Sequence, residues 1–108
     1  MPTAAQPTLQ YEDAQVRVTR WDFEPGTATG HHLHSHDYVV VPVADGRVRA
    51  LTLDGGGTDS VLKAGQSDAR PAGGAHDVVN IGDAPLAFVE IELKHTAPVA
   101  PPVQGGRQ

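Results

Sequence analysis

The amino-acid sequence predicts an all-β protein, built as an antiparallel sandwich or closed barrel. Short runs of alternating apolar and polar side chains recur along the chain, glycine and proline separate these runs, and no segment shows a sustained helical period. The 108 residues include 12 glycines and 9 prolines, a composition typical of many short strands joined by tight turns. A chain of this length forms one domain with its own core.

The first predicted strand spans residues 15–23, where Val16 and Val18 alternate with polar residues. Pro25-Gly26 marks the turn that follows it. The next strand is predicted over residues 38–43, a run rich in β-branched valines that favours an extended backbone.

Asp45-Gly46 lies between two such runs, residues 38–43 and residues 47–53. An Asp-Gly pair in this setting is a strong signal for a β-hairpin, so we predict that the two runs pair directly. Turn signals rich in glycine, proline or aspartate separate the remaining runs. These later strands are predicted over residues 60–63, 66–70, 76–81 and 86–93.

The two ends of the chain differ in composition from the region between them. Residues 1–10 are polar and contain proline, so we expect a flexible N-terminal arm, followed by the folded domain over residues 11–95. Residues 96–108 are rich in Pro, Ala, Gly and Gln, and we expect a disordered tail. The N-terminus lacks the features of a secretory signal, and no apolar run reaches membrane-spanning length. We therefore expect a cytoplasmic protein with no membrane partner.

Charge and cysteine content narrow the function further. The formal net charge of −5 argues against a nucleic-acid partner, whose phosphates require clustered Lys and Arg. The chain has no cysteine, which removes disulfides, thiol catalysis and cysteine-ligated metals together. With nucleic acid and membrane partners excluded, we expect the protein to bind a small-molecule substrate.

Histidines supply the one specific chemical signal. His32 and His34 share a face if their segment is extended, because successive side chains of a strand point to opposite sides. His76 follows a Pro/Gly corner, begins a later strand and is the candidate third ligand. Three imidazoles with open positions are a common arrangement for a catalytic metal. His36 has the same parity as the pair, so it is an additional ligand, a pocket residue or an exposed side chain.

The spacing of these residues resembles the two motifs of the cupin family. The first motif is matched at its glycines and histidine pair by Gly26, His32, His34 and Gly46. The second motif is matched at every position by Gly65, Pro71, Gly73, His76 and Asn80. The segment 30–42 is also similar to a group of small bacterial cupins, some of them connected with β-alanine catabolism. The resemblance implies a cupin-type antiparallel β-barrel (double-stranded β-helix, or jelly roll) and a homodimer.

One position departs from the family pattern. The glutamate of the first motif is replaced by Val39, or by Tyr38 if the shorter family spacing applies. The resemblance therefore implies a metal site of three histidines without a carboxylate. Family members with such sites include iron(II) dioxygenases, which implies Fe²⁺ and dioxygenase-type oxidation of a small chelating substrate. Zn²⁺, Ni²⁺, Mn²⁺ and Cu²⁺ are alternative cofactors.

Two other functions stay open on the sequence. The barrel is either a non-catalytic module that binds a small ligand, or a Lewis-acid cyclase, isomerase or lyase. We expect the pocket walls to be built by Tyr38, Val39, Val41 and Phe88. Asp37 either orients a ligand imidazole or caps a turn. Glu90 and Glu92 share one face of the last strand, which we interpret as a solvated face in preference to the position of a general base.

Overall fold

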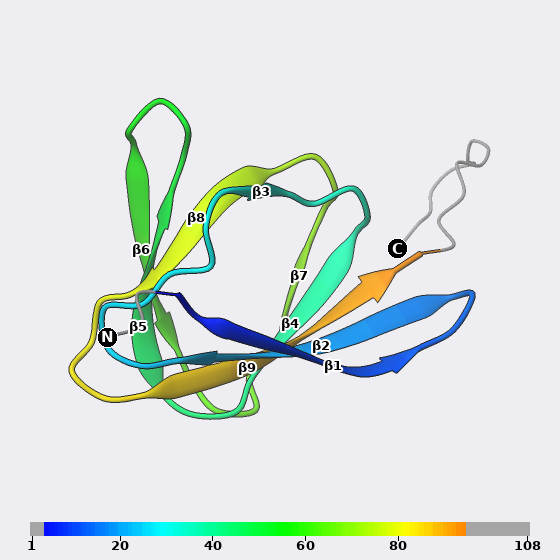
Figure 1. Cartoon of the computed structure of the whole chain (residues 1–108), viewed down its shortest axis with the longest axis horizontal. Helices are drawn as coiled ribbons and strands as arrows, with labels where there is room; N and C mark the ends of the chain where they lie inside the picture. Colours follow the sequence, from blue (N-terminus) through cyan, green and yellow to red (C-terminus); the bar gives the residue numbers. More distant parts are fainter. Residues whose placement is uncertain (1–3, 95–108) are drawn as a thin grey trace.

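The computed structural model describes residues 4–94, which form two antiparallel sheets (Figure 1). Within this range it contains no helix long and apolar enough to cross a membrane. The larger sheet has the strand order β1-β2-β9-β4-β7, and the smaller has the order β3-β8-β5-β6. The strands are β1 (Gln6–Glu12), β2 (Val16–Phe23), β3 (His32–Leu33), β4 (Tyr38–Pro42), β5 (Gly46–Leu51), β6 (Gly57–Leu62), β7 (Asp68–Arg70), β8 (Ala75–Asn80) and β9 (Leu86–Leu93). The predicted all-β fold is confirmed.

The core lies where the inner faces of the two sheets meet. Phe23 and Phe88 come from adjacent strands of the larger sheet, and their ring centroids lie 5.3 Å apart. Val48 and Val78 pack on them from the smaller sheet. Burial of these four apolar side chains holds the sheets together at one end and leaves the other end for the polar residues described below.

The predicted hairpin at Asp45-Gly46 is wrong. β4 pairs with β9 and β7, whereas β5 pairs with β6 and β8, so Asp45-Gly46 carries the chain from one sheet to the other. A hairpin turn of the expected type needs a positive φ, and Gly46 does not have one. Its glycine serves close packing instead, because a Cβ there would lie 2.6 Å from Leu86 Cδ2.

The N-terminal segment also differs from the prediction of a flexible arm over residues 1–10. Residues 6–10 belong to β1, which pairs antiparallel with β2 at the edge of the larger sheet. Every residue of β1 is exposed, so the segment shows no apolar alternation from which a strand could be recognised. β1 is therefore held in place by its backbone hydrogen bonds to β2. Residues 1–3 and the predicted tail at 96–108 lie outside the described residues.

Asn80 joins the ends of three segments from inside the protein. Its side chain is 1 % exposed, and its Nδ2 donates to the carbonyl oxygens of Phe23 and Ala84, at 3.3 and 2.9 Å. Its Oδ1 accepts a 2.9 Å hydrogen bond from the Gly82 N–H. From its buried position the side chain thus satisfies backbone groups at the end of β2 and in the turn between β8 and β9.

Replacing Asn80 with Ala should lower the free energy of unfolding by about 2–3 kcal/mol, because two backbone carbonyls and one N–H lose their buried partner. Urea denaturation followed by circular dichroism measures the change. Thr58→Ala, at an exposed position of β6, is the control and should change stability by less than about 0.5 kcal/mol. Equal stability of the two variants would contradict the role of Asn80.

Candidate metal centre

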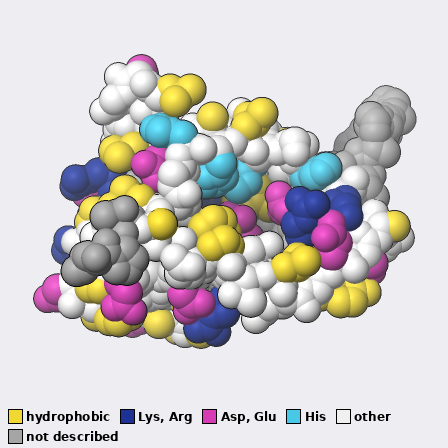
Figure 2. Space-filling model, viewed as in Figure 1, with side chains coloured by type: hydrophobic (Ala, Val, Ile, Leu, Met, Phe, Trp, Pro, Cys, Tyr) yellow, Lys and Arg dark blue, Asp and Glu magenta, His cyan; other side chains and the backbone are white. Residues whose placement is uncertain are grey.

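Three imidazoles meet between β3 and β8. His32 pairs directly with His76 across these two strands, and His34 follows the end of β3. The Nε2 atom of His34 lies 3.0 Å from Nε2 of His32 and 3.2 Å from Nε2 of His76. His34 is buried and the other two are half-buried. The three predicted ligands are therefore brought together. Histidine side chains reach the surface at several separate places on the face shown in Figure 2.

Backbone hydrogen bonds fix the position of His34. Its N–H donates to the Gly74 carbonyl at 3.0 Å, and its own carbonyl accepts from the Gly73 N–H at 2.8 Å. Gly73 has a φ of 103°, which other residues rarely adopt. Asp37 Oδ1 accepts a 2.8 Å hydrogen bond from the Ala72 N–H. Of the two roles considered for Asp37, the structure shows this contact to the corner between β7 and β8.

The proton position on His32 follows from its neighbours. Its Nδ1 lies 2.8 Å from the Gly30 carbonyl oxygen, which can only accept, so Nδ1 carries the proton and Nε2 presents its lone pair. Gly30 is held in turn, because its N–H donates to Asp77 Oδ1 at 3.0 Å. Such a hydrogen bond on the far nitrogen is the usual way in which a metal-binding imidazole is oriented.

The three imidazoles fit a divalent metal ion in both charge and spacing. Two nitrogens about 2.1 Å from one ion and at right angles to each other lie about 3.0 Å apart, close to the separations found here. Burial, followed by the charges of His32 and His76, lowers the pKa of His34 to about 4. Burial is also the main cause that lowers the pKa of His76. Neutral imidazoles are the form that binds a metal.

Tyr38 occupies the inward position that follows the histidine pair. Its ring stacks on His34, with centroids 4.0 Å apart and an interplanar angle of 19°. Burial raises the pKa of its hydroxyl. Val39 points to the opposite face of the sheet, since it pairs with Ile91 of β9. Of the two positions considered for the missing glutamate, the structure thus places Tyr38 against the histidines.

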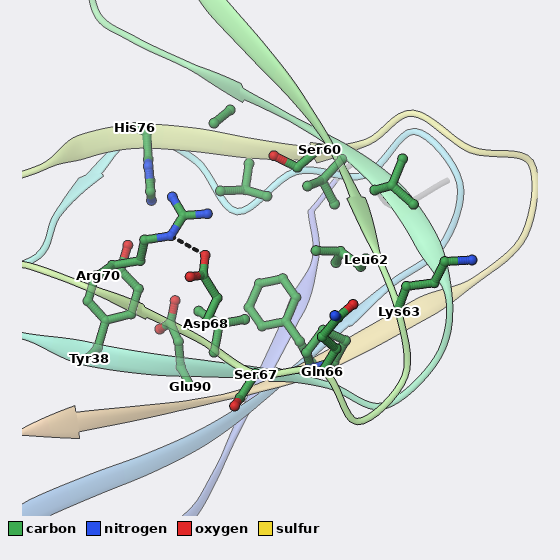
Figure 3. Close-up of a pocket in the computed structure, with 17 residues that line it drawn as sticks. Tyr38, Ser60, Leu62, Lys63, Gln66, Ser67, Asp68, Arg70, His76 and Glu90 are labelled. Atoms are coloured by element: carbon green, nitrogen blue, oxygen red, sulfur yellow. Dashed lines mark hydrogen bonds and ion pairs between the residues drawn. The ribbon is translucent and has the colours of Figure 1, made fainter.

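A pocket of about 390 Å³ opens beside His76 between the two sheets (Figure 3). Tyr38 and Phe88, both expected in the pocket walls, line it. The prediction that Val39 and Val41 form its walls is wrong, because Val40 lines the pocket and its two neighbours face outward. The run of valines gives no sign of which parity faces inward. His36 lies outside both the histidine group and the pocket lining.

Glu90 also belongs to this region, although the sequence interpretation placed it on a solvated face. Its side chain is 12 % exposed, and Oε2 lies 4.0 Å from Nε2 of His34. Burial, together with the charge of Glu92, raises the pKa of Glu90 to about 7, while a hydrogen bond from Trp21 opposes the rise. The expectation of a solvated face is therefore wrong for Glu90. Its parity with Phe88 was the available signal, because both point to the same side of β9.

Comparisons with known proteins agree with this fold. The family model described as a cupin domain matches residues 19–92. The β-alanine degradation protein BauB of Pseudomonas aeruginosa is 47 % identical over 90 residues, which cover 83 % of this chain and 94 % of that protein. A crystal structure of a cupin domain from Bordetella pertussis Tohama I has 45 % identity and a TM-score of 0.81, covering 87 % and 97 % of the two chains.

More distant structures share the fold alone. A protein from Klebsiella pneumoniae with a double-stranded β-helix domain has a TM-score of 0.70 at 24 % identity, covering 88 % of this chain and 81 % of that one.

Glu90 should make the stability of the metal-free protein depend on pH. Its pKa is 4.5 in the unfolded chain and about 7 when folded, so its contribution to stability is complete below about pH 4.5 and is lost as the pH rises through about 7. Relative to Glu90→Gln, the wild-type free energy of unfolding should fall by up to about 3 kcal/mol between about pH 4.5 and 8. Urea titrations with a chelator present measure this difference.

Trp21→Phe tests the same account from the other side. Loss of the indole N–H removes the hydrogen bond that lowers the pKa of Glu90. The free energy of unfolding of this variant should therefore fall more steeply with rising pH than that of wild type. A difference between wild type and Glu90→Gln that stays constant with pH would contradict the shifted pKa.

Proposed function

The chain belongs to the cupin family, and on that premise we propose that it is a metal-dependent enzyme acting on a small molecule. The observation that carries the proposal is the convergence of His32, His34 and His76 beside the pocket. Three imidazole ligands leave part of the coordination sphere of a divalent ion open. We further propose dioxygenase-type oxidation of a small chelating substrate, with Fe²⁺ as the metal.

The protein contributes position and surroundings to this chemistry. A bound divalent metal supplies a Lewis acid and, if it is redox-active, a site where dioxygen and substrate react. Val40, Val78 and Phe88 line the pocket with apolar surface, which limits the access of bulk water to the substrate. Tyr38 fixes the plane of the His34 ring by stacking on it. These residues hold the reacting groups in place. We also propose that the enzyme acts in the cytoplasm.

The relative from Pseudomonas aeruginosa supports a catabolic substrate. That protein is named for the degradation of β-alanine. Because 94 % of it aligns with this chain at 47 % identity, we propose that this protein acts on a small metabolite of comparable size. A pocket of about 390 Å³ suits such a molecule.

We also propose that the protein is a homodimer. The face of the larger sheet that points away from the pocket carries a row of half-buried apolar side chains. They lie side by side on β2, β9 and β4: Val18, Val39, Val41, Val89 and Ile91. A second copy that covers this face would remove its apolar surface from water. The exposed edge strand β1 would be protected by the same contact.

His76→Ala should remove most of the bound metal, because two imidazoles from one segment are left to hold the ion. Elemental analysis of untagged protein, grown with iron, zinc, nickel and manganese present, measures the metal content. His31→Ala is the matched control at an exposed histidine next to the site and should keep full metal content. A His76→Ala protein that retains its metal would contradict the three-histidine centre.

The bound metal and oxygen uptake then separate the alternatives. Iron with substrate-dependent oxygen consumption supports the oxygenase. Bound zinc without oxygen consumption favours a Lewis-acid cyclase, isomerase or lyase. A protein that takes up no metal from any of these salts is a binding module, and the proposed enzyme would be wrong.

Ile91→Arg should convert the dimer into a monomer, because a charge in the middle of the apolar face must be desolvated when two copies meet. Sedimentation equilibrium measures the mass in solution. Thr58→Arg, exposed on the smaller sheet, should leave the dimer intact. A wild-type protein that sediments as a monomer at micromolar concentration contradicts the proposed interface.

A further inference from the structure

Two oppositely charged side chains of the pocket belong to neither histidine motif. Glu90 lies on β9 next to His34, with its carboxylate 4.0 Å from the imidazole nitrogen. Arg70 lies on β7, and its side chain points into the pocket toward His76 (Figure 3). A ligand in the pocket therefore meets an anion near the imidazoles and a cation on the β7 side.

Arg70 has donors to spare. Its Nε–H donates to Asp68 Oδ2 at 2.6 Å, and this is the only hydrogen bond that the Arg70 side chain makes among residues 4–94. The two terminal Nη groups of its guanidinium are left as a pair of parallel donors. A planar fork of this kind matches a carboxylate, which it binds through two hydrogen bonds. Burial raises the pKa of Tyr38 and lowers that of His76, and the positive charge of Arg70 opposes the first change and adds to the second.

Glu90 has acceptors to spare. Trp21 donates one hydrogen bond to it, and a carboxylate offers about four lone-pair positions. At 12 % exposure, water has limited access to the remaining positions. A hydroxyl or amino group of a bound molecule would supply the donor that this side chain lacks inside the protein. An apolar group in the same place would leave the carboxylate buried without a partner.

We infer that the pocket takes a small carboxylic acid that also carries a hydroxyl or amino group. Arg70 binds the carboxylate of this ligand, and Glu90 accepts a hydrogen bond from its donor group next to the histidines. The inference deepens the proposed function by naming the substrate class. A simple acid satisfies only Arg70 and a simple alcohol satisfies only Glu90, so selectivity comes from the two side chains together.

Calorimetric titration of the zinc-loaded protein at about pH 8 tests the inference without turnover, because zinc has no redox chemistry. The probes are propanoate, propan-1-ol, 3-hydroxypropanoate and 3-aminopropanoate, with the matching five-carbon set for a longer spacing. At one or both lengths, a difunctional acid should bind at least about ten-fold more tightly than the simple acid and the simple alcohol. Comparison of the hydroxy and amino acids shows which donor Glu90 accepts.

Two variants should divide this selectivity between the two side chains. Arg70→Gln should weaken binding of every acid by about ten-fold and leave binding of the alcohol unchanged. Glu90→Gln should remove the preference for the difunctional acid over the simple acid and leave binding of the simple acid unchanged. The matched controls are Arg49→Gln, whose side chain pairs with Asp59 on the smaller sheet, and Glu12→Gln, whose side chain pairs with Arg17 and Lys94 away from the pocket. Both should bind all probes as wild type does.

The result that overturns the inference is a zinc-loaded wild type that binds difunctional and simple acids equally well at both chain lengths, or that binds none of them. The inference is also wrong if the preference for the difunctional acid persists in both Arg70→Gln and Glu90→Gln. These outcomes leave the metal site intact, since zinc content is measured separately in each sample. Failure of the proposed function shows instead as loss of zinc from wild type, and the probe series on that metal-free protein still tests the two side chains.

Discussion

The pair of backbone hydrogen bonds between His34 and the corner before β8 is the contact on which the site depends. The corner at Gly73 and Gly74 holds His34 through one donated and one accepted hydrogen bond, at 3.0 and 2.8 Å. β8 begins directly after this corner, and its second residue, His76, lies opposite His32. This contact extends the pairing of β3 with β8 and holds His34 close to His76, from which it is 42 residues away in the chain. The second family motif therefore contains both a metal ligand, His76, and a residue of the corner that holds His34, Gly73.

Burial has opposite consequences for the acids and bases gathered at this junction. It lowers the pKa of His34 and His76 and so keeps the imidazoles neutral, ready to bind a cation. The same exclusion of water raises the pKa of Glu90 and of the Tyr38 hydroxyl. One physical cause thus prepares a metal site and leaves a carboxyl group beside it whose ionisation lies near neutral pH. Glu90 lies beside the imidazoles but outside the group of candidate ligands.

Much of the fold and the centre of the site could be predicted because they depend on local signals. The match of His32, His34 and His76 to the two family motifs was sufficient to predict that they lie together. The mistakes share one cause. The Asp45-Gly46 pair indicates a tight turn, but whether the flanking strands pair with each other depends on which sheet each strand joins. Likewise β1 has no buried face, so only its partner strand reveals it.

The sequence by itself determined the all-β class, the family and the three imidazoles. Only the tertiary structure decided which side of β4 and β9 faces the pocket. Alternation assigns side chains to two faces, but where valines occupy both faces of a strand it cannot say which one is inside. That choice turned Val40 inward in place of Val39 and buried Glu90 beside His34. It also brought Arg70 into the same pocket from β7. Burial and charge are properties of neighbours, and these neighbours come from strands that are distant in the chain.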